Sequence, residues 1–284
     1  MCGIIGYYGT KEIKPILLNG LKRLEYRGYD SAGISIMESS GIYTQKNAGN
    51  VSELAKNLKL SEIQGKIGMG HTRWATHGEP TDLNAHPHLD QTGKISLIHN
   101  GIIENYNSIK KVLIDKGYEF QSETDSEVLV QLISDIYFSD DLSFEQAVQV
   151  ALTQVIGAYG IVTFCSEEPD TLVAARHGSP MVLGIGEDDY FIASDASPIV
   201  DYTRNVVYLD EDEIVTIKNG SHEIRSMKND KVLQKVVTEI NFSIDEIEKG
   251  EFDHFMLKEI HDQVHSITDT MRGRVNKEDG TAHL

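Results

Sequence analysis

The pattern of apolar positions changes twice along this 284-residue chain. In the first half, several stretches repeat apolar residues every three or four positions, which is the spacing of one helix face. The clearest stretch, residues 12–25, carries five of them: Ile13, Ile16, Leu17, Leu21 and Leu24. Further helices are predicted at 51–58, 105–116, 126–138 and 143–155, with strands at the start of the chain and at 31–37, 42–48, 67–74 and 95–99.

Beyond Gly157 the helical spacing stops and short β-rich runs follow one another, separated by Gly, Asp, Asn and Pro. These runs predict strands at 158–165, 171–176, 181–185, 190–194, 206–217 and 222–227. Helices that are grouped between groups of strands favour antiparallel sheets covered by helices. The predicted fold class is therefore α+β, with layered sheets and helices.

The pattern changes again near residue 243. The acidic stretch 245–251 is typical of a linker, and a helix is predicted from His254 to Met271. The last residues, 276–284, are polar and add no strand or helix, so we expect a cut inside a longer protein, with a naturally frayed end as the alternative. This divides the chain into a domain over 1–240 and a separate segment over 241–284.

The charge and the cysteine content of the chain indicate which partners and which compartment to expect. The chain has 26 basic and 44 acidic residues, and its formal charge of −18 repels phosphate backbones and anionic membranes. We therefore expect neither a nucleic-acid nor a membrane partner. The two cysteines, Cys2 and Cys165, are far apart and form no disulfide framework, and no leader or long apolar span accompanies them, which predicts a cytoplasmic protein. Cys165 lies in an apolar strand-like run and is predicted to be core.

Cys2 is the first candidate for chemistry. If Met1 is removed, one residue carries both a thiol and an α-amine, whose unperturbed pKa of roughly 8 suits it to accept the thiol proton. The thiolate is the nucleophile in acyl transfer. A small buried cysteine is the structural alternative. Gly3, Gly6 and Gly9 allow close backbone approach around the terminus, which favours a functional site.

Four more segments combine polar residues with glycine or a helix start: Glu25 to Gly33, His71 to Gly78, His99 to Asn105 and Ser122 to Glu127. The first is typical of a surface turn. In the second, the Arg73 guanidinium can hold an α-carboxylate through two parallel hydrogen bonds.

The last two segments offer a further donor pair and a carboxylate. The Asn100 amide and the Gly101 N–H could stabilise an oxyanion, although Asn-Gly is also the commonest hairpin turn. Asp125 could bind a substrate ammonium, although an acidic residue in the first turn of a helix is stabilising in any case. Ser122 and Thr124 are candidate helix caps.

Histidines His71, His77, His86 and His88 lie close enough in sequence to suggest a metal site. The chain lacks an HExxH motif and paired-cysteine spacing, so we interpret these histidines as hydrogen-bonding residues and predict no metal.

Together, Cys2-Gly3-Ile4 and the four segments resemble the class II glutamine amidotransferases, whose glutaminase belongs to the N-terminal nucleophile hydrolases. The resemblance covers residues 1 to about 240 and implies a four-layer αββα sandwich with Cys2 at the end of a central strand. EYRGYDSAG, HTRWATHGEP and HNGIIENY are most similar to members that transfer ammonia to fructose 6-phosphate. The segment from His254 to Gln263 resembles the start of their sugar-phosphate isomerase half, and the full-length protein would be a homodimer.

The resemblance also implies roles for individual residues. L-Glutamine would be hydrolysed through a Cys2 γ-glutamyl thioester, with Asn100 and Gly101 as the oxyanion hole and no metal or organic cofactor. Four residues would hold the glutamine backbone: Arg73, Thr76, His77 and Asp125. Trp74 would lie at the mouth of an ammonia channel, and Arg27 in a loop that shields the thioester. Two alternatives stay open, namely another acceptor for the ammonia and a silent glutamine-binding module that keeps Met1.

Overall fold

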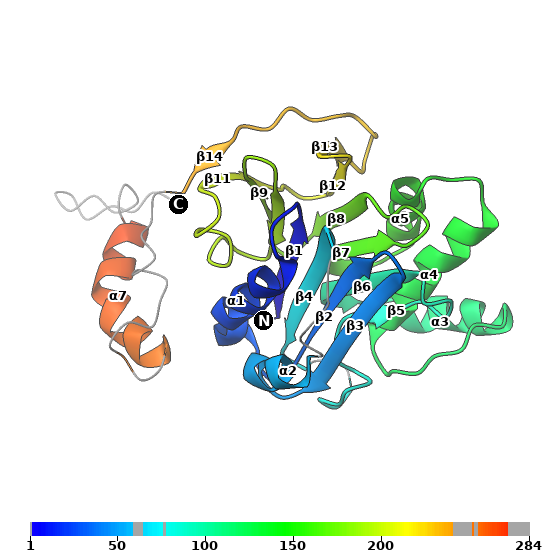
Figure 1. Cartoon of the computed structure of the whole chain (residues 1–284), viewed down its shortest axis with the longest axis horizontal. Helices are drawn as coiled ribbons and strands as arrows, with labels where there is room; N and C mark the ends of the chain where they lie inside the picture. The colour runs from blue at the N-terminus through cyan, green and yellow to red at the C-terminus, as the bar shows by residue number, and fades with distance from the viewer. Residues whose placement is uncertain (1, 59–64, 76–77, 241–251, 253–254, 272–284) are drawn as a thin grey trace. The chain divides into compact units, whose positions relative to one another are not determined.

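The computed structural model describes residues 2–58, 65–75, 78–240, 252 and 255–271 (Figure 1). The chain divides into two compact units, Met1–Asn241 and Phe242–Leu284. In the described part of the second unit, helix α7 (Phe255–Met271) forms where the apolar spacing predicts it. The predicted linker at 245–251 and the polar end at 276–284 lie outside the described residues. No helix in the described ranges is long and apolar enough to cross a membrane.

Two antiparallel sheets form the centre of the first unit. One sheet has eight strands in the order β14 (Thr238–Glu239), β11 (Asn205–Tyr208), β9 (Val182–Ile185), β10 (Tyr190–Ala193), β1 (Gly3–Tyr8), β4 (Ile67–Arg73), β2 (Ser31–Glu38) and β3 (Gly41–Ala48). The other has six, in the order β13 (Ser221–Ser226), β12 (Glu213–Lys218), β8 (Thr171–His177), β7 (Gly157–Cys165), β6 (Ile95–Ile103) and β5 (His88–Leu89). β1 therefore lies inside its sheet, with β10 and β4 on either side.

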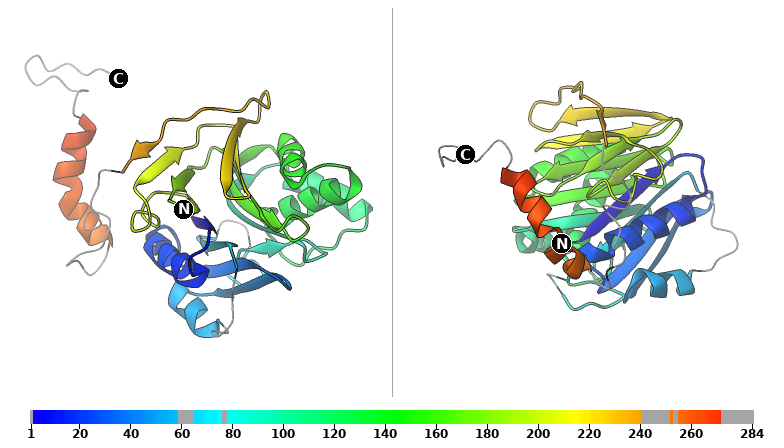
Figure 2. Two further views of the ribbon diagram at one scale, coloured as in Figure 1. Left: turned by 45° about the horizontal axis from the view of Figure 1, so that its top comes forward. Right: turned by 90° about the vertical axis from the view of Figure 1, so that its left-hand side faces the viewer.

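Helices cover the outer faces of both sheets (Figure 2). Helices α1 (Ile13–Leu24) and α2 (Val51–Asn57) contact the eight-stranded sheet, and α4 (Asp125–Ser139) and α5 (Phe144–Thr153) contact the six-stranded one. Helix α3 (Tyr106–Asp115) packs on α4. These are the four layers of an αββα sandwich.

Period-two alternation along the strands divides the core into two layers. Ile98, Val162 and Phe164 belong to the cluster between the sheets. Ile161 and Cys165, at the alternate positions, belong to the cluster under α4 and α5. The prediction that Cys165 is a core residue is confirmed, because its side chain is fully buried.

The apolar stripe of α1 is confirmed in full, since all five of its predicted residues are buried. Gly3, at the start of β1, lets this helix approach the sheet. A Cβ atom on Gly3 would lie 2.6 Å from the Cβ of Leu24, a separation that real side chains do not show. Gly3 therefore places α1 close against the start of β1, next to Cys2.

The predicted strand at 206–217 is wrong as a single element. The structure has β11 and β12 there, in different sheets, joined through Asp212 with a φ of 61°. The acidic run Asp210-Glu211-Asp212 was the turn signal within an otherwise β-rich stretch. The two-residue strands β5 and β14 are too short for a periodicity to predict, and β6 continues four residues beyond its predicted end at residue 99.

Candidate active site

Cys2 lies directly before β1, and the register of the sheet determines its neighbours. Gly3 pairs with Thr72 of β4, so Cys2 lies beside the end of β4 and the residues that follow it. The Trp74 N–H donates to the Cys2 Sγ at 3.2 Å. The Cys2 carbonyl accepts two hydrogen bonds of 3.1 Å, from Arg27 Nε and from Asn100 Nδ2. The residue is thus held through its sulfur and its carbonyl by three separate parts of the chain.

Burial raises the pKa of the Cys2 thiol, and the hydrogen bond from the Trp74 backbone only partly opposes this effect. At neutral pH the thiol is therefore protonated. A nucleophilic role requires a base that removes this proton.

Asn100 and Gly101 lie inside strand β6, so the hairpin interpretation of Asn-Gly is wrong. They pair with Gly160 and Tyr159 of β7 in an uninterrupted antiparallel register. Gly101 has a φ of 134°, and a Cβ atom there would lie 2.0 Å from the Ala158 carbonyl oxygen. Glycine is required by this backbone geometry, not by a turn. The distorted strand end lies across the sandwich from Cys2.

Arg73 and Asp125 lie on different elements but line the same small cavity as Cys2. Both side chains are buried. The Arg73 guanidinium donates to the carbonyls of Gly78 and Glu79, at 3.3 Å each. Asp125 begins α4 and accepts the Ile103 N–H at 2.8 Å. Arg73 at the end of β4 and Asp125 at the start of α4 therefore line one cavity.

Thr124 caps α4 as predicted, with its side chain accepting the Glu127 N–H at 3.2 Å. The second predicted cap, Ser122, instead bonds to the Glu127 carboxylate at 2.6 Å. The Thr124 cap therefore fixes the start of α4, where Asp125 lies.

The other predicted site residues are Trp74, Arg27, Thr76 and His77. Trp74 is 51% exposed and packs edge-on against Tyr29. Arg27 lies in the short helix η1 (Glu25–Arg27), not in a loop, and its buried guanidinium pairs with Asp195 at 2.9 Å. The surface-turn interpretation is therefore wrong for Arg27. Thr76 and His77 lie outside the described residues.

Four buried histidines cluster at the cavity, which His86 and His99 line: His71, His86, His88 and His99. Three of them, His71, His86 and His88, are among the histidines predicted to be hydrogen-bonding residues. His86 Nε2 and His99 Nδ1 both contact Ser126 Oγ, at 2.8 and 2.9 Å. Burial lowers the pKa of His71 to about 3 and also holds the pKa of His86 and His88 well below its usual value. These three imidazoles are neutral. No metal-binding group of three side chains occurs among the described residues.

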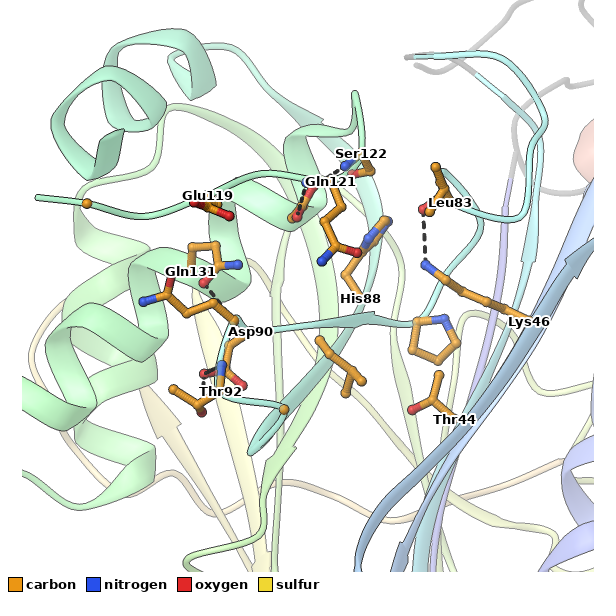
Figure 3. A pocket seen from close by; sticks show the side chains of 16 residues that line it. Thr44, Lys46, Leu83, His88, Asp90, Thr92, Glu119, Gln121, Ser122 and Gln131 are labelled. Carbon is orange, nitrogen blue, oxygen red and sulfur yellow. Dashed lines mark hydrogen bonds between the residues drawn. The ribbon is translucent and has the colours of Figure 1, made fainter. Parts of the chain in front are cut away.

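A second, larger cavity of about 870 Å³ opens between β3, β5 and α4 (Figure 3). Its most unusual group is Lys46, whose ammonium donates to the carbonyls of Leu83 and Ala85 at 3.1 and 2.6 Å. Burial lowers the pKa of Lys46 to about 8. The ammonium ties the loop that contains His86 to the edge of the eight-stranded sheet.

Lys46 gives a prediction for the pH dependence of stability. An unfolded lysine keeps a pKa near 10.5, so between pH 8 and 10.5 the unfolded state binds more protons than the folded state. The free energy of unfolding should therefore rise with pH in this window, by roughly 2–3 kcal/mol relative to Lys46→Met. Urea titrations at several pH values measure this difference. Lys56→Met, at an exposed lysine, is the control. If the difference in the free energy of unfolding between wild type and Lys46→Met did not change with pH, the lowered pKa of Lys46 would be contradicted.

Two facing antiparallel sheets between helix layers, with a cysteine at the start of an inner strand, define an amidotransferase of the N-terminal nucleophile hydrolase type. Residues 59–241 match the model of the glutamine amidotransferase domain, and the chain belongs to this family. A solved glutamine phosphoribosylpyrophosphate amidotransferase from B. subtilis superposes with a TM-score of 0.70 at 26% identity, over 80% of this chain and 49% of that chain.

Curated relatives share more of the sequence. The chain is 53% identical to a glutamine–fructose-6-phosphate aminotransferase (isomerizing) of Chlorobaculum tepidum, over 100% of this chain and 47% of the relative. It is 49% identical to the protein of the same name from Bacteroides thetaiotaomicron, over 98% of this chain and 45% of the relative. The chain therefore spans about half the length of these relatives.

Proposed function

We propose that this chain hydrolyses L-glutamine to glutamate and ammonia through a γ-glutamyl thioester on Cys2. One observation carries the proposal. Cys2, Arg73, Asp125 and Gly101, which carry a thiol, a guanidinium, a carboxylate and a backbone N–H, line a single cavity although they come from separate elements. The set matches the needs of glutamine, which presents a carboxylate, an ammonium and a side-chain amide.

The reaction begins with proton transfer. The α-amine of Cys2, available once Met1 is removed, accepts the thiol proton, and the thiolate forms a C–S bond with the glutamine Cδ. The carbonyl electrons move to oxygen, where the Asn100 amide and the Gly101 N–H donate hydrogen bonds. When the carbonyl reforms, the C–N bond of the glutamine side chain breaks. The proton that the Cys2 α-amine took from the thiol passes to the departing nitrogen, which leaves as ammonia. Water then cleaves the thioester, giving glutamate and the thiol.

Glutamine binding requires movement at this site. The cavity holds about 20 Å³, room for a single water molecule. In our proposal Arg73 takes the α-carboxylate and Asp125 the ammonium, while Thr76 and His77 complete the contacts with the substrate backbone. Trp74 lies at the ammonia exit, and Arg27, whose Nε donates to the Cys2 carbonyl, shields the thioester. Asn100 Nδ2 gives up its hydrogen bond to the Cys2 carbonyl and donates to the oxyanion instead.

The acceptor of the ammonia is proposed from the relatives' names. We assign this chain to the glutaminase half of a glucosamine-6-phosphate synthase, with fructose 6-phosphate as acceptor. In this proposal, residues 1–240 form the glutaminase domain, and residues 241–284 form a linker and the start of the isomerase half. The complete protein would be a cytoplasmic homodimer. The two free cysteines support a reducing compartment.

Product analysis tests the proposal. The 284-residue chain, incubated with amide-¹⁵N glutamine and fructose 6-phosphate, should release labelled ammonium and glutamate and no labelled amino sugar. The short second unit cannot enclose a phosphosugar with a core of its own. Labelled glucosamine 6-phosphate would show that the domain boundary is wrong. Binding of glutamine without hydrolysis, in a chain that retains Met1, would favour a silent binding module.

Arg73→Lys and Asp125→Asn should raise the KM for glutamine by roughly 10- to 100-fold and leave kcat within a few-fold, because each change weakens a charged hydrogen bond made before the transition state. Asn at position 125 can still accept the Ile103 N–H, which preserves the fold. Steady-state kinetics measure both constants. Arg23→Gln, which removes a surface partner of Asp201, is the control. A fall in kcat at constant KM would contradict these roles.

A further inference from the structure

The orientation of the Asn100 side chain decides whether it can serve as an oxyanion donor. Its amide carries a donor, Nδ2, and an acceptor, Oδ1, on two nearly identical arms. Turned by 180°, the same side chain would present oxygen to an oxyanion and repel it. Some neighbouring group must therefore distinguish the two arms, and the structure contains one behind the amide.

His71 occupies that place. It lies on β4 of the opposite sheet and is fully buried, with Nε2 2.9 Å from Asn100 Oδ1 and 3.1 Å from the His99 carbonyl oxygen. A backbone carbonyl can only accept, so the contact with His99 requires a hydrogen on Nε2. The atom of Asn100 that faces this hydrogen must then be the acceptor, Oδ1. Nδ2 is directed away from His71, toward Cys2.

The imidazole is well fixed for this task. Its ring stacks on His86 at 4.2 Å between centroids. Its pKa of about 3 keeps it neutral, so Nδ1 carries no hydrogen when Nε2 does. Nδ1 is buried and has no hydrogen-bond partner among the described residues, so no competing contact there stabilises the other tautomer.

We propose that His71 is a positioning residue for glutamine hydrolysis: its Nε2–H holds Asn100 Oδ1 and thereby directs Asn100 Nδ2 to the oxyanion. The inference rests on the proposed function. In the free protein the Cys2 carbonyl also favours this orientation, because it accepts from Nδ2 at 3.1 Å. During the reaction Nδ2 turns to the oxyanion and that contact is lost. The His71 bond is then the one described contact that still fixes the amide.

Kinetics separate this role from general support of the fold. His71→Leu should lower kcat by roughly 10²-fold and change KM less than about threefold, because a misdirected donor acts on the transition state. His71→Gln, whose Nε2 reaches the place of the imidazole Nε2, should recover most of the loss. Thr163→Val is the control. Thr163 is also fully buried, but its hydroxyl donates to the Ser96 carbonyl at 2.8 Å and it does not line the cavity, so kcat should stay within about threefold of wild type.

A double-mutant cycle gives the decisive result. If His71 acts through Asn100, adding His71→Leu to Asn100→Ala should leave kcat at the value of Asn100→Ala alone. Multiplicative losses would overturn the proposal, as would a His71→Gln variant no better than His71→Leu.

An NMR measurement distinguishes failure of this inference from failure of the proposed function. ¹⁵N spectra of the imidazole rings should show a protonated Nε2 and a bare Nδ1 on His71 from about pH 5 to about pH 9. This readout does not depend on activity. A wild-type chain without glutaminase activity would sink the proposed function and with it the inference, whereas an Nδ1–H tautomer in an active chain would sink the inference alone.

Discussion

Replacing Cys2 by alanine is expected to lower the glutaminase kcat by roughly 10⁴-fold or more, because in the proposed mechanism the thiol forms the covalent intermediate and alanine has no group for that step. The measurement is glutamate release by the variant with Met1 removed, as confirmed by intact mass. Substantial hydrolysis by this variant would contradict the nucleophile assignment.

Cys165→Ala provides the control. This thiol is fully buried under α4 and α5, and burial raises its pKa to about 11, so it is a poor nucleophile. The variant should stay active, with a modest loss of stability of about 1 kcal/mol for the small cavity. A glutamine-analogue electrophile should label Cys2 and leave Cys165 unmodified. Labelling at Cys165 in the folded protein would show that the two thiols are not distinguished as the structure indicates.

Asn100→Ala should give the second largest loss, a fall in kcat of roughly 10² to 10³ with little change in glutamine affinity. In the proposed mechanism, the variant lacks a donor that acts mainly on the developing oxyanion. Asn100→Asp has nearly the same shape but presents a negative oxygen, so its kcat should fall at least as far. Single-turnover kinetics separate the chemical step from binding.

Asn47→Ala is a suitable control for Asn100→Ala, because Asn47 is also a buried asparagine, but its Nδ2 donates to the Ala48 carbonyl on β3 and not to Cys2. It should keep kcat near wild type. If Asn100→Ala weakened binding and kept kcat, Asn100 would be a substrate-binding residue and not an oxyanion donor.

The sequence by itself determined the local elements and the chemical inventory. The stripe of apolar residues in α1 predicts its helix because periodicity is a property of neighbouring residues. The alternation of β7 and the cap at Thr124 are local in the same way. The candidate nucleophile, guanidinium and carboxylate were predicted from residue type and motif order, which do not require a fold.

Only the tertiary structure decided how these groups meet. Cys2 and Asn100 lie 98 residues apart on different sheets, and the hydrogen bond between them is a long-range contact that no local spacing encodes. The same reason explains the errors. Asn100-Gly101 has the sequence of a hairpin turn, but β7 pairs with both residues and keeps them in a strand. The run 206–217 divides into two strands because its two ends pair with different sheets. In the sequence His71 is one polar residue of a motif. Only the fold shows that the Asn100 Oδ1 of the facing sheet lies 2.9 Å from its Nε2.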